Sequence, residues 1–361
     1  MTQTLVLYVL TLFIVYLLAR KARMTNDKIS LMLIIVILSL LVGLRGETVG
    51  IDTSTYVRYF HLIGNGRFNY VWGVEYTFKI IMLVVSQIFG SYTVLFLLIA
   101  ILTNICIVMR LWDFRDISNF EWVVVTYYIG FYFYEFNIMR QMCAIAVVFW
   151  ASRYIEKGKY LRFIAGIAIA CIFHKSALLG VIFLISEIVN WKFLNKWQQR
   201  TICAASLCVP IGVLYLFREL SSYFRYFSSF KIRLGPILLL KVMLFILSQW
   251  NLRNAIVSHK LQSVAMNRNE VVRKLNYKIR AIEAMYFIGL ILAFAGYANK
   301  TVSRIALYPY ILECVYYGML MKYKKIRSGY PIIIVLLLGY LFINALIKGG
   351  QGQNPYLFFW Q

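Results

Sequence analysis

Three short clusters of polar residues interrupt an otherwise apolar chain. They read RGETVGIDT at residues 45–53, NIMRQ at 137–141 and FHKSAL at 173–178. Arginine binds phosphate oxygens through a planar pair of donors, whereas histidine and aspartate can accept a proton from a reacting hydroxyl. The arginine at 140 opens a predicted helix, whose first backbone N–H groups also suit an anion. These residue types therefore indicate chemistry on an anionic substrate.

The chain that carries these clusters is far too apolar for a soluble protein. Of its 361 residues, 61% are hydrophobic and only 14% are charged, against about 45–50% and about 25% in soluble domains. This excludes a soluble enzyme, a disordered protein and a secreted disulfide scaffold. We expect an all-α polytopic integral membrane protein with one transmembrane domain over residues 1–361. The six cysteines lie in apolar runs and are expected to be buried without disulfides.

The apolar runs predict about twelve transmembrane helices. The run at 74–89 carries Glu75 and Lys79, and if it crossed the membrane, the later basic connectors would face outside. Because basic loops normally stay in the cytoplasm, we expect 74–89 to be an interfacial or re-entrant helix at the outer face, and both termini to lie outside. The runs are 4–19, 29–44, 74–89, 92–109, 121–135, 137–155, 161–174, 177–190, 199–217, 237–250, 281–299, 302–320 and 331–347.

This topology separates the formal net charge of +24 into two populations. Mixed lysine and arginine connectors lie inside, including a long basic loop at 251–280. The outer loops, chiefly 45–91 and 218–236, retain arginines on the side where the rule predicts few cations. Either these arginines reach for lipid headgroups or they bind an anionic substrate. The outer arginines are Arg45, Arg58, Arg67, Arg140, Arg218, Arg225, Arg233 and Arg304.

Five segments in order resemble the EpsG family, which is grouped with Wzy-type polymerases of bacterial surface polysaccharide (O-antigen, capsule or exopolysaccharide). The first three are the clusters described above. The other two are Ser303-Arg304-Ile305 with Tyr308, and the terminal Asn354-Pro355-Tyr356 with Phe358 and Phe359. The resemblance spans most of the chain.

The resemblance implies a metal-independent glycosyltransferase of GT-C-like fold, without a cofactor, in the bacterial cytoplasmic (inner) membrane. The growing glycan would be transferred from undecaprenyl diphosphate to a sugar hydroxyl of a lipid-linked repeat unit at the periplasmic, extracytoplasmic face. The implied partners are this undecaprenyl-diphosphate-linked oligosaccharide, membrane lipid and a polysaccharide chain-length regulator. Nucleic acid is not among them.

Roles for single residues follow from this chemistry. Diphosphate leaves readily once its charge is stabilised, and we assign this to Arg45, Arg140 and Arg304. For the proton of the attacking hydroxyl, His174 is the first candidate and Asp52 the second; Asp52 could instead orient the acceptor or an arginine. Three weaker candidates for sugar or lipid contact are Tyr56, Tyr308 and Arg225.

Two other functions fit the same sequence. A lipid-linked glycan flippase or transporter would need a polar path at the middle of the membrane. The interior ionisable residues Lys241, Glu283, Glu313 and Glu187 are instead scattered singly, and we expect them in buried pairs or near helix ends. An O-antigen ligase would share the donor and differ only in its acceptor.

Overall fold

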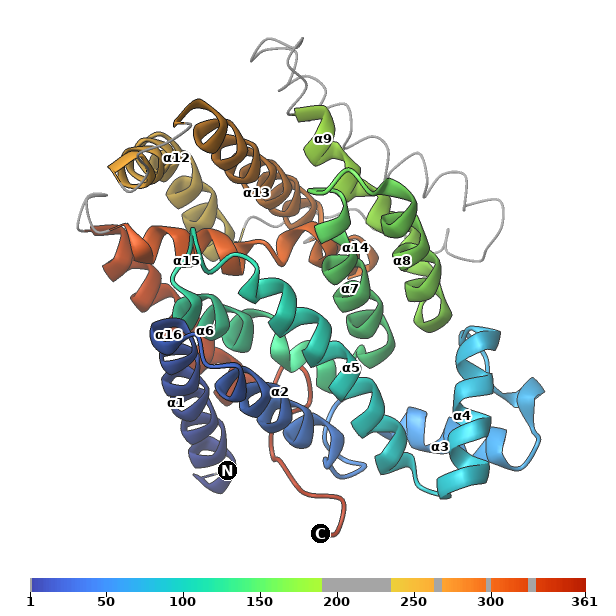
Figure 1. The fold of residues 1–361 in the computed structure, drawn as a ribbon. Coiled ribbons are helices and arrows are strands. Elements are labelled where there is room, and N and C mark those ends of the chain that lie inside the picture. The colour runs from blue at the N-terminus through green and yellow to red at the C-terminus, as the bar shows by residue number, and fades with distance from the viewer. Residues whose placement is uncertain (1, 190–234, 263–267, 297–299, 324–328) are drawn as a thin grey trace.

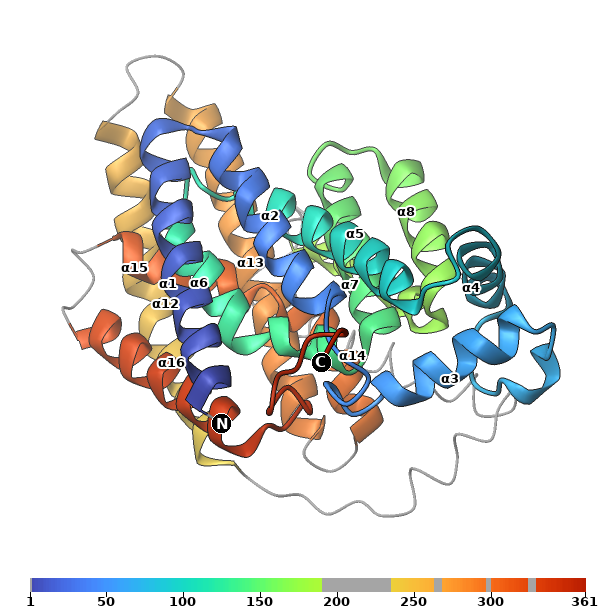
Figure 2. The ribbon, with the colours of Figure 1, turned by 90° about the horizontal axis from the view of Figure 1, so that it is seen from below.

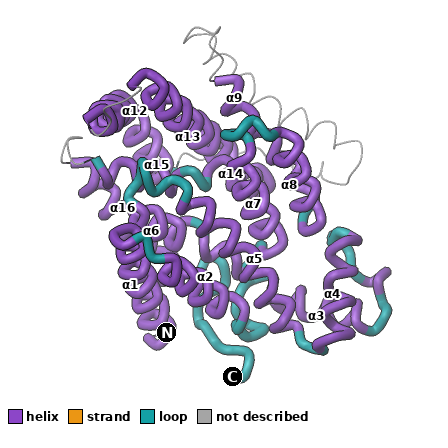
Figure 3. The backbone as a smooth tube through the Cα atoms, viewed as in Figure 1, coloured by secondary structure: helices purple, strands orange, loops and turns teal. Residues whose placement is uncertain are grey.

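A computed structural model describes residues 2–189, 235–262, 268–296, 300–323 and 329–361. Within these ranges the chain is built from helices and loops, with no strand (Figures 1 and 3). The all-α expectation is therefore confirmed. Three of the described helices are long and apolar enough to cross a membrane, and they support an integral membrane protein. They are α1 (Thr2–Thr25), α5 (Tyr92–Trp112) and α16 (Gly329–Lys348).

A capped turn joins the first two helices. Asn26 takes a left-handed backbone conformation after α1, which asparagine tolerates well. Asp27 then caps α2 (Lys28–Gly43), because its carboxylate accepts the backbone N–H of Ile29 at 2.9 Å. α2 returns along α1 and packs against α5. This packing fixes the position of the loop at 44–52, which directly follows the last residue of α2.

The residues after this loop form an arm that projects beside α5 (Figures 1 and 2). It contains α3 (Thr53–Gly64), the short 3₁₀ segment η1 (Phe68–Tyr70) and α4 (Tyr76–Phe89). On α4, exposed apolar side chains recur every four residues at Tyr76, Ile80, Val84 and Ile88, while Phe78, Met82 and Val85 are buried. Such a stripe suits the interfacial position predicted for 74–89.

The centre of the molecule is formed by short helices. α7 (Met139–Ala151) packs against α5 and α8 (Tyr160–Phe173), and nearly all its residues are buried. The remaining central elements are α6 (Phe120–Gly130), η2 (Tyr132–Phe136), η3 (Ser152–Tyr154), η4 (Lys175–Leu184) and α9 (Ile185–Val189). The predicted runs 121–135, 137–155 and 177–190 are thus shorter or broken helices.

The later helices differ from the predicted runs in two places. The run at 302–320 is divided into α14 (Lys300–Tyr310) and α15 (Glu313–Lys322), with Pro309 in the last turn of α14. The basic segment 251–280 is largely helical, because it continues α12 (Pro236–Gln262) and begins α13 (Arg268–Gly296). Residues 190–234, and with them most of the predicted outer loop 218–236, lie outside the described residues.

Of the four interior ionisable residues, Lys241 and Glu313 form a buried pair as expected, whereas Glu283 is buried in the middle of α13. The Lys241 ammonium lies 2.9 Å from the Glu313 carboxylate, and both side chains are buried. Glu187 lies on the short helix α9 and accepts the hydroxyl of Tyr277. Pairing of this kind lowers the cost of placing charge in an apolar interior.

The two ends of the chain lie on the same side of the molecule (Figure 1). The Tyr8 hydroxyl donates to the Gln353 carbonyl at 2.7 Å, and the Tyr356 N–H donates to the Thr4 hydroxyl at 3.0 Å. The two terminal segments are therefore in contact, and their position outside the membrane stays a prediction.

Candidate functional site

Arg140 lies in the first turn of α7 and reaches the arm. Its guanidinium pairs with Glu75 and donates to the Gly73 carbonyl at 3.1 Å and to the Tyr56 hydroxyl at 3.2 Å. Glu75 is the residue directly before α4, so that the start of one helix faces the start of another. These contacts hold the cation at the junction of α3, α4 and α7.

Glu75 connects this cation to the histidine cluster. One carboxylate oxygen pairs with Arg140, and the other accepts the backbone N–H of Lys175 at 2.9 Å. From the sequence, Glu75 counted only as a charged residue in the run at 74–89. The sequence separation of Glu75 from Arg140 and from Lys175 does not predict these contacts, because they join three separate segments of the chain.

His174 is held at the end of α8 in a fixed orientation. Its Nδ1 accepts the backbone N–H of Ser176 at 3.2 Å and lies 2.7 Å from the Ser176 hydroxyl, which contacts the Tyr308 hydroxyl at 2.9 Å. Since a backbone N–H can only donate, Nδ1 is the acceptor and the neutral ring carries its proton on Nε2. The ring therefore presents a donor, not a base, to a ligand.

The surroundings of His174 keep it uncharged at neutral pH. Burial lowers the pKa of His174 to about 4 by disfavouring the imidazolium. The Glu75 carboxylate acts in the opposite direction, while Arg140, Lys175 and Arg304 add to the lowering. Arg140 and Arg304 also act on the other candidate base, Asp52.

Asp52 precedes α3, and its carboxylate is not used to cap that helix. Partial burial raises the pKa of Asp52 above its ordinary value, and Arg304 and Arg140 oppose this rise. A carboxylate with a raised pKa and no hydrogen bond to its own helix is a suitable proton acceptor. Of the two predicted candidates, Asp52 is thus the one whose side chain makes no hydrogen bond to its own helix.

Arg304 lies on α14 and is the fourth residue of this group, with Arg140, His174 and Asp52. Its side chain is exposed and makes no hydrogen bond or ion pair with the described residues, although its field acts on Asp52 and His174. Gln141, the neighbour of Arg140 on α7, donates to the Arg304 carbonyl at 3.1 Å. Gln141 belongs to the NIMRQ cluster but was not predicted as a site residue. It fixes α14 against α7.

Arg45 lies away from this group in the interior. It has no exposed surface, and it donates to the Val42 carbonyl at 2.6 Å and to the Thr53 hydroxyl at 3.2 Å. Its guanidinium also lies 4.3 Å from the centre of the Phe96 ring. This geometry favours a structural role for Arg45 over the predicted diphosphate contact, which would require a rearrangement.

The terminal segment of the chain supports the same loop. Gly50 donates its N–H to the Gly352 carbonyl at 2.6 Å, and Gly46 donates to the Leu357 carbonyl at 2.8 Å. The Tyr356 hydroxyl donates to the Leu41 carbonyl at 2.8 Å. The terminal residues Gly352 and Leu357 thus hold the loop that carries Asp52, while Tyr356 holds the end of α2.

The two tyrosines predicted to contact sugar, Tyr56 and Tyr308, lie beside other residues of the candidate site. Tyr56 and Tyr308 are both buried, and their hydroxyls contact Arg140 and Ser176 respectively. These contacts favour positioning of the cation and of the imidazole over stacking on sugar. Arg225 lies outside the described residues. Among the residues that are described, no group of three His, Cys, Asp or Glu side chains could hold a metal ion.

Comparison with known proteins gives one match. A model of the EpsG family, a family of proteins like Wzy-type polysaccharide polymerases, matches residues 28–358. The five segments at which the sequence resembles this family all lie at least partly within the match. No curated protein and no solved structure matches the chain.

Proposed function

This chain belongs to the EpsG family, and from that premise we propose that it polymerises lipid-linked oligosaccharide repeat units. The growing glycan is transferred from undecaprenyl diphosphate to a sugar hydroxyl of an incoming lipid-linked unit. The reaction takes place at the outer face of the cytoplasmic membrane, in a fold related to the GT-C class. A metal is not required, because arginines neutralise the diphosphate.

The convergence of Arg140, Arg304, Asp52 and His174 is the observation that carries this proposal. The two arginines act on the carboxyl and on the imidazole at once, so the four groups share one electrostatic environment. The leaving diphosphate gains negative charge as its bond to the sugar breaks. Fixed cations and N–H donors aimed at that charge lower the barrier without reorganising.

The proposed step transfers one glycosyl group. The acceptor hydroxyl oxygen attacks the anomeric carbon, and the bond between that carbon and the diphosphate oxygen breaks with its electrons on the diphosphate. Asp52 takes the proton of the attacking hydroxyl. Arg304 and Arg140 bind diphosphate oxygens, and the Nε2–H of His174 donates to the same leaving group. Glu75 holds Arg140 in position.

Substitutions in a strain that depends on this protein test the assignment. Arg140→Ala and His174→Ala should each reduce the rate of chain elongation by roughly 10²–10³, the usual cost of removing one such stabiliser. Asp52→Asn should reduce it by roughly 10²–10⁴, the contribution of a general base. Glycan length is measured on gels, with the membrane abundance of each variant. Arg58→Ala is the matched control, since Arg58 is exposed on α3 and stacks on Tyr59.

The same glycan profile separates the proposal from the other two functions. A polymerase deletion loses long chains and keeps single repeat units on the surface. A flippase or ligase deletion loses all surface glycan. Normal chain lengths in the Arg140→Ala and Asp52→Asn variants would contradict the site assignment.

A further inference from the structure

The candidate active site contains a cation to which the proposed reaction gives no role. Lys175 directly follows His174 as the first residue of η4, and its side chain is exposed. The backbone N–H of Lys175, not its ammonium group, donates to the Glu75 carboxylate at 2.9 Å. This contact therefore fixes the backbone of the lysine and leaves the side chain at the surface of the site.

Arg304 lies on the helix face that packs against the start of η4. It precedes Tyr308 by four residues on α14, so the two side chains share one face of the helix. The Tyr308 hydroxyl lies 2.9 Å from the hydroxyl of Ser176, the residue after Lys175. The fields of Arg304 and Lys175 also both reach His174. The two exposed cations therefore border the same imidazole.

The elements that carry the three cations of the site are tied to one another in a closed circuit. Glu75 joins the start of η4 to Arg140 on α7. Gln141, next on α7, donates to the Arg304 carbonyl at 3.1 Å, and α14 returns to η4 through Tyr308. The backbones at all three cations are thus held in place before a substrate binds, which is the condition for electrostatic stabilisation without reorganisation.

The charges brought together by these contacts have a positive sum. There are three cations and two carboxylates, and the imidazole is neutral. Arg140 and Arg304 alone would be balanced by Glu75 and Asp52, so the one remaining positive charge is that of Lys175. Lys175 therefore decides whether the site as a whole attracts an anion.

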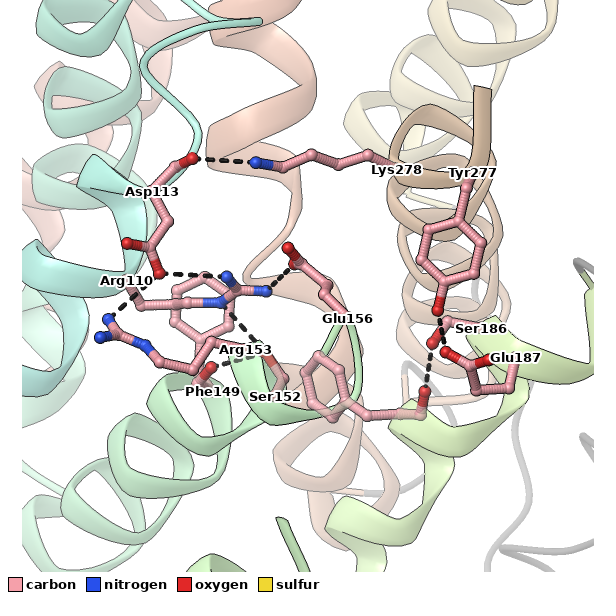
Figure 4. Close-up of polar contacts among 11 residues, drawn as sticks. Arg110, Asp113, Phe149, Ser152, Arg153, Glu156, Ser186, Glu187, Tyr277 and Lys278 are labelled. Carbon is pink, nitrogen blue, oxygen red and sulfur yellow. Dashed lines mark hydrogen bonds and ion pairs between the residues drawn. The ribbon is translucent and has the colours of Figure 1, made fainter. Parts of the chain in front are cut away.

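The polar cluster at the other end of α7 differs in this respect. Arg110 is buried there, pairs with Glu156 and with Asp113 at 3.2 Å, and donates to the Ser152 hydroxyl at 3.1 Å (Figure 4). The charge of Arg110 is thus balanced within the protein. An anionic substrate is expected at the end of α7 where exposed cations remain.

We propose that Lys175 binds the diphosphate of the lipid-linked donor together with Arg304 and supplies the net positive charge of the site. This inference rests on the proposed function. The diphosphate carries a negative charge on each phosphate and gains another when its bond to the sugar breaks. Asp52 becomes neutral when it takes the acceptor proton, so the positive charge of the site rises by one in the same step. An ammonium group interacts with this growing charge as a point charge.

Binding of undecaprenyl diphosphate to the purified full chain in phosphatidylcholine nanodiscs tests this role. The ligand should raise the unfolding temperature of the wild type. Lys175→Gln should weaken its apparent affinity about tenfold, the effect of removing one charge-assisted hydrogen bond. Lys175→Arg should retain the affinity. The matched control is Lys348→Gln, which removes the same charge from an exposed position at the end of α16.

A structural role of Lys175 predicts a different result. Lys175→Gln keeps the backbone N–H that contacts Glu75, so the unfolding temperature without ligand should stay close to that of the wild type. Chain elongation below donor saturation should slow about tenfold, because weaker donor binding raises KM, and Lys175→Arg should restore it.

Two outcomes separate this inference from the proposed function. Equal affinities of Lys175→Gln and Lys348→Gln for undecaprenyl diphosphate would overturn the role of Lys175 and leave the proposed function standing. A wild type that undecaprenyl diphosphate does not stabilise would contradict both.

Discussion

Glu75 joins two parts of the candidate site that are 35 residues apart in the chain. It pairs with Arg140 through one oxygen and holds the backbone after His174 through the other. A carboxylate in this position fixes the orientation of an arginine that would otherwise have several rotamers. Glu75 therefore positions Arg140 relative to the backbone that follows His174.

Replacing Glu75 should loosen Arg140 without removing it. We expect Glu75→Gln to lower the rate of chain elongation by roughly 10–100-fold, because misplacement of a catalytic group by about 1 Å has this effect. Glu75→Asp, which keeps the charge, should recover part of the activity. The comparison is made by glycan length at equal membrane abundance. Glu47→Gln, at an exposed position in the preceding loop, should leave glycan length unchanged.

The uncharged state of His174 predicts a dependence of stability on pH. Burial lowers the pKa of His174 in the folded chain to about 4, below the ordinary value of 6.5. The unfolded chain therefore binds the proton at higher pH, so this residue reduces stability as the pH falls from about 6.5 towards about 4.

Unfolding temperatures at different pH values check this prediction. Between about pH 7.5 and about pH 5, the wild type should lose more thermal stability than His174→Asn. His61→Asn, which changes an exposed histidine on α3, should follow the wild type. Parallel curves for the wild type and His174→Asn would contradict the buried neutral state.

At the scale of elements, the contact between loop 44–52 and the terminal segment depends on glycine. Gly50 has a φ of +98°, and a Cβ at this position would lie 2.1 Å from the Phe136 carbonyl oxygen. Gly352 faces it from the terminal segment, where a Cβ would lie 2.6 Å from the Ile51 nitrogen. The backbones approach too closely here for any side chain.

Gly50→Ala should therefore displace the loop that carries Asp52. Its matched control is Gly66→Ala, since Gly66 also has a positive φ, of +73°, but a Cβ there meets open space. Gly66→Ala should lower the free energy of unfolding only by the cost of backbone strain, about 1–3 kcal/mol. Gly50→Ala should cost more and should also abolish chain elongation. Thermal unfolding and glycan length measure the two effects, and equal losses in the two variants would be inconsistent with the close contact.

The ion pair between α12 and α15 makes a further prediction at this scale. Lys241 and Glu313 are buried together and share hydrogen bonds with Tyr310 and Tyr286. Glu313→Gln leaves a buried ammonium without its counter-ion, and this should lower the free energy of unfolding by about 3–5 kcal/mol. Replacing both residues by methionine should recover most of the loss, because no unpaired charge then remains. Reversible unfolding in detergent compares the two variants.

At the scale of the whole molecule, α7 separates two polar regions. The candidate active site lies at its first turn, together with both chain termini, and a second polar cluster around Arg110 lies beyond its last turn. Mixed lysine and arginine segments lie towards the second region, where the positive-inside rule expects the cytoplasm. The candidate active site and this second polar cluster thus lie at opposite ends of one buried helix.

Cysteine labelling tests this arrangement in whole cells. In a background without the six native cysteines, Ser54→Cys should react with a membrane-impermeant thiol reagent added outside, because Ser54 is exposed next to Asp52. Lys157→Cys, exposed beyond the far end of α7, should react only after the membrane is opened. Labelling of both positions from the same side would contradict the predicted orientation.

Properties that are local to a stretch of chain can be predicted from the amino-acid sequence alone. Its apolar runs established a helical membrane protein, since hydrophobic length decides whether a helix can cross a bilayer. Its polar clusters pointed to Arg140, His174 and Asp52, because polar groups in apolar surroundings are costly unless they have a function or a partner. The match to the EpsG family spans these clusters.

Only the tertiary structure decided which of these residues meet. It buried Arg45 between Phe96 and Phe136, joined Glu75 to Arg140, and brought the terminal segment onto the loop before Asp52. It also used the Ser176 N–H to place the proton of His174 on Nε2. Such contacts join residues far apart in the chain. They depend on how the helices pack, and a pattern within one segment does not contain that information.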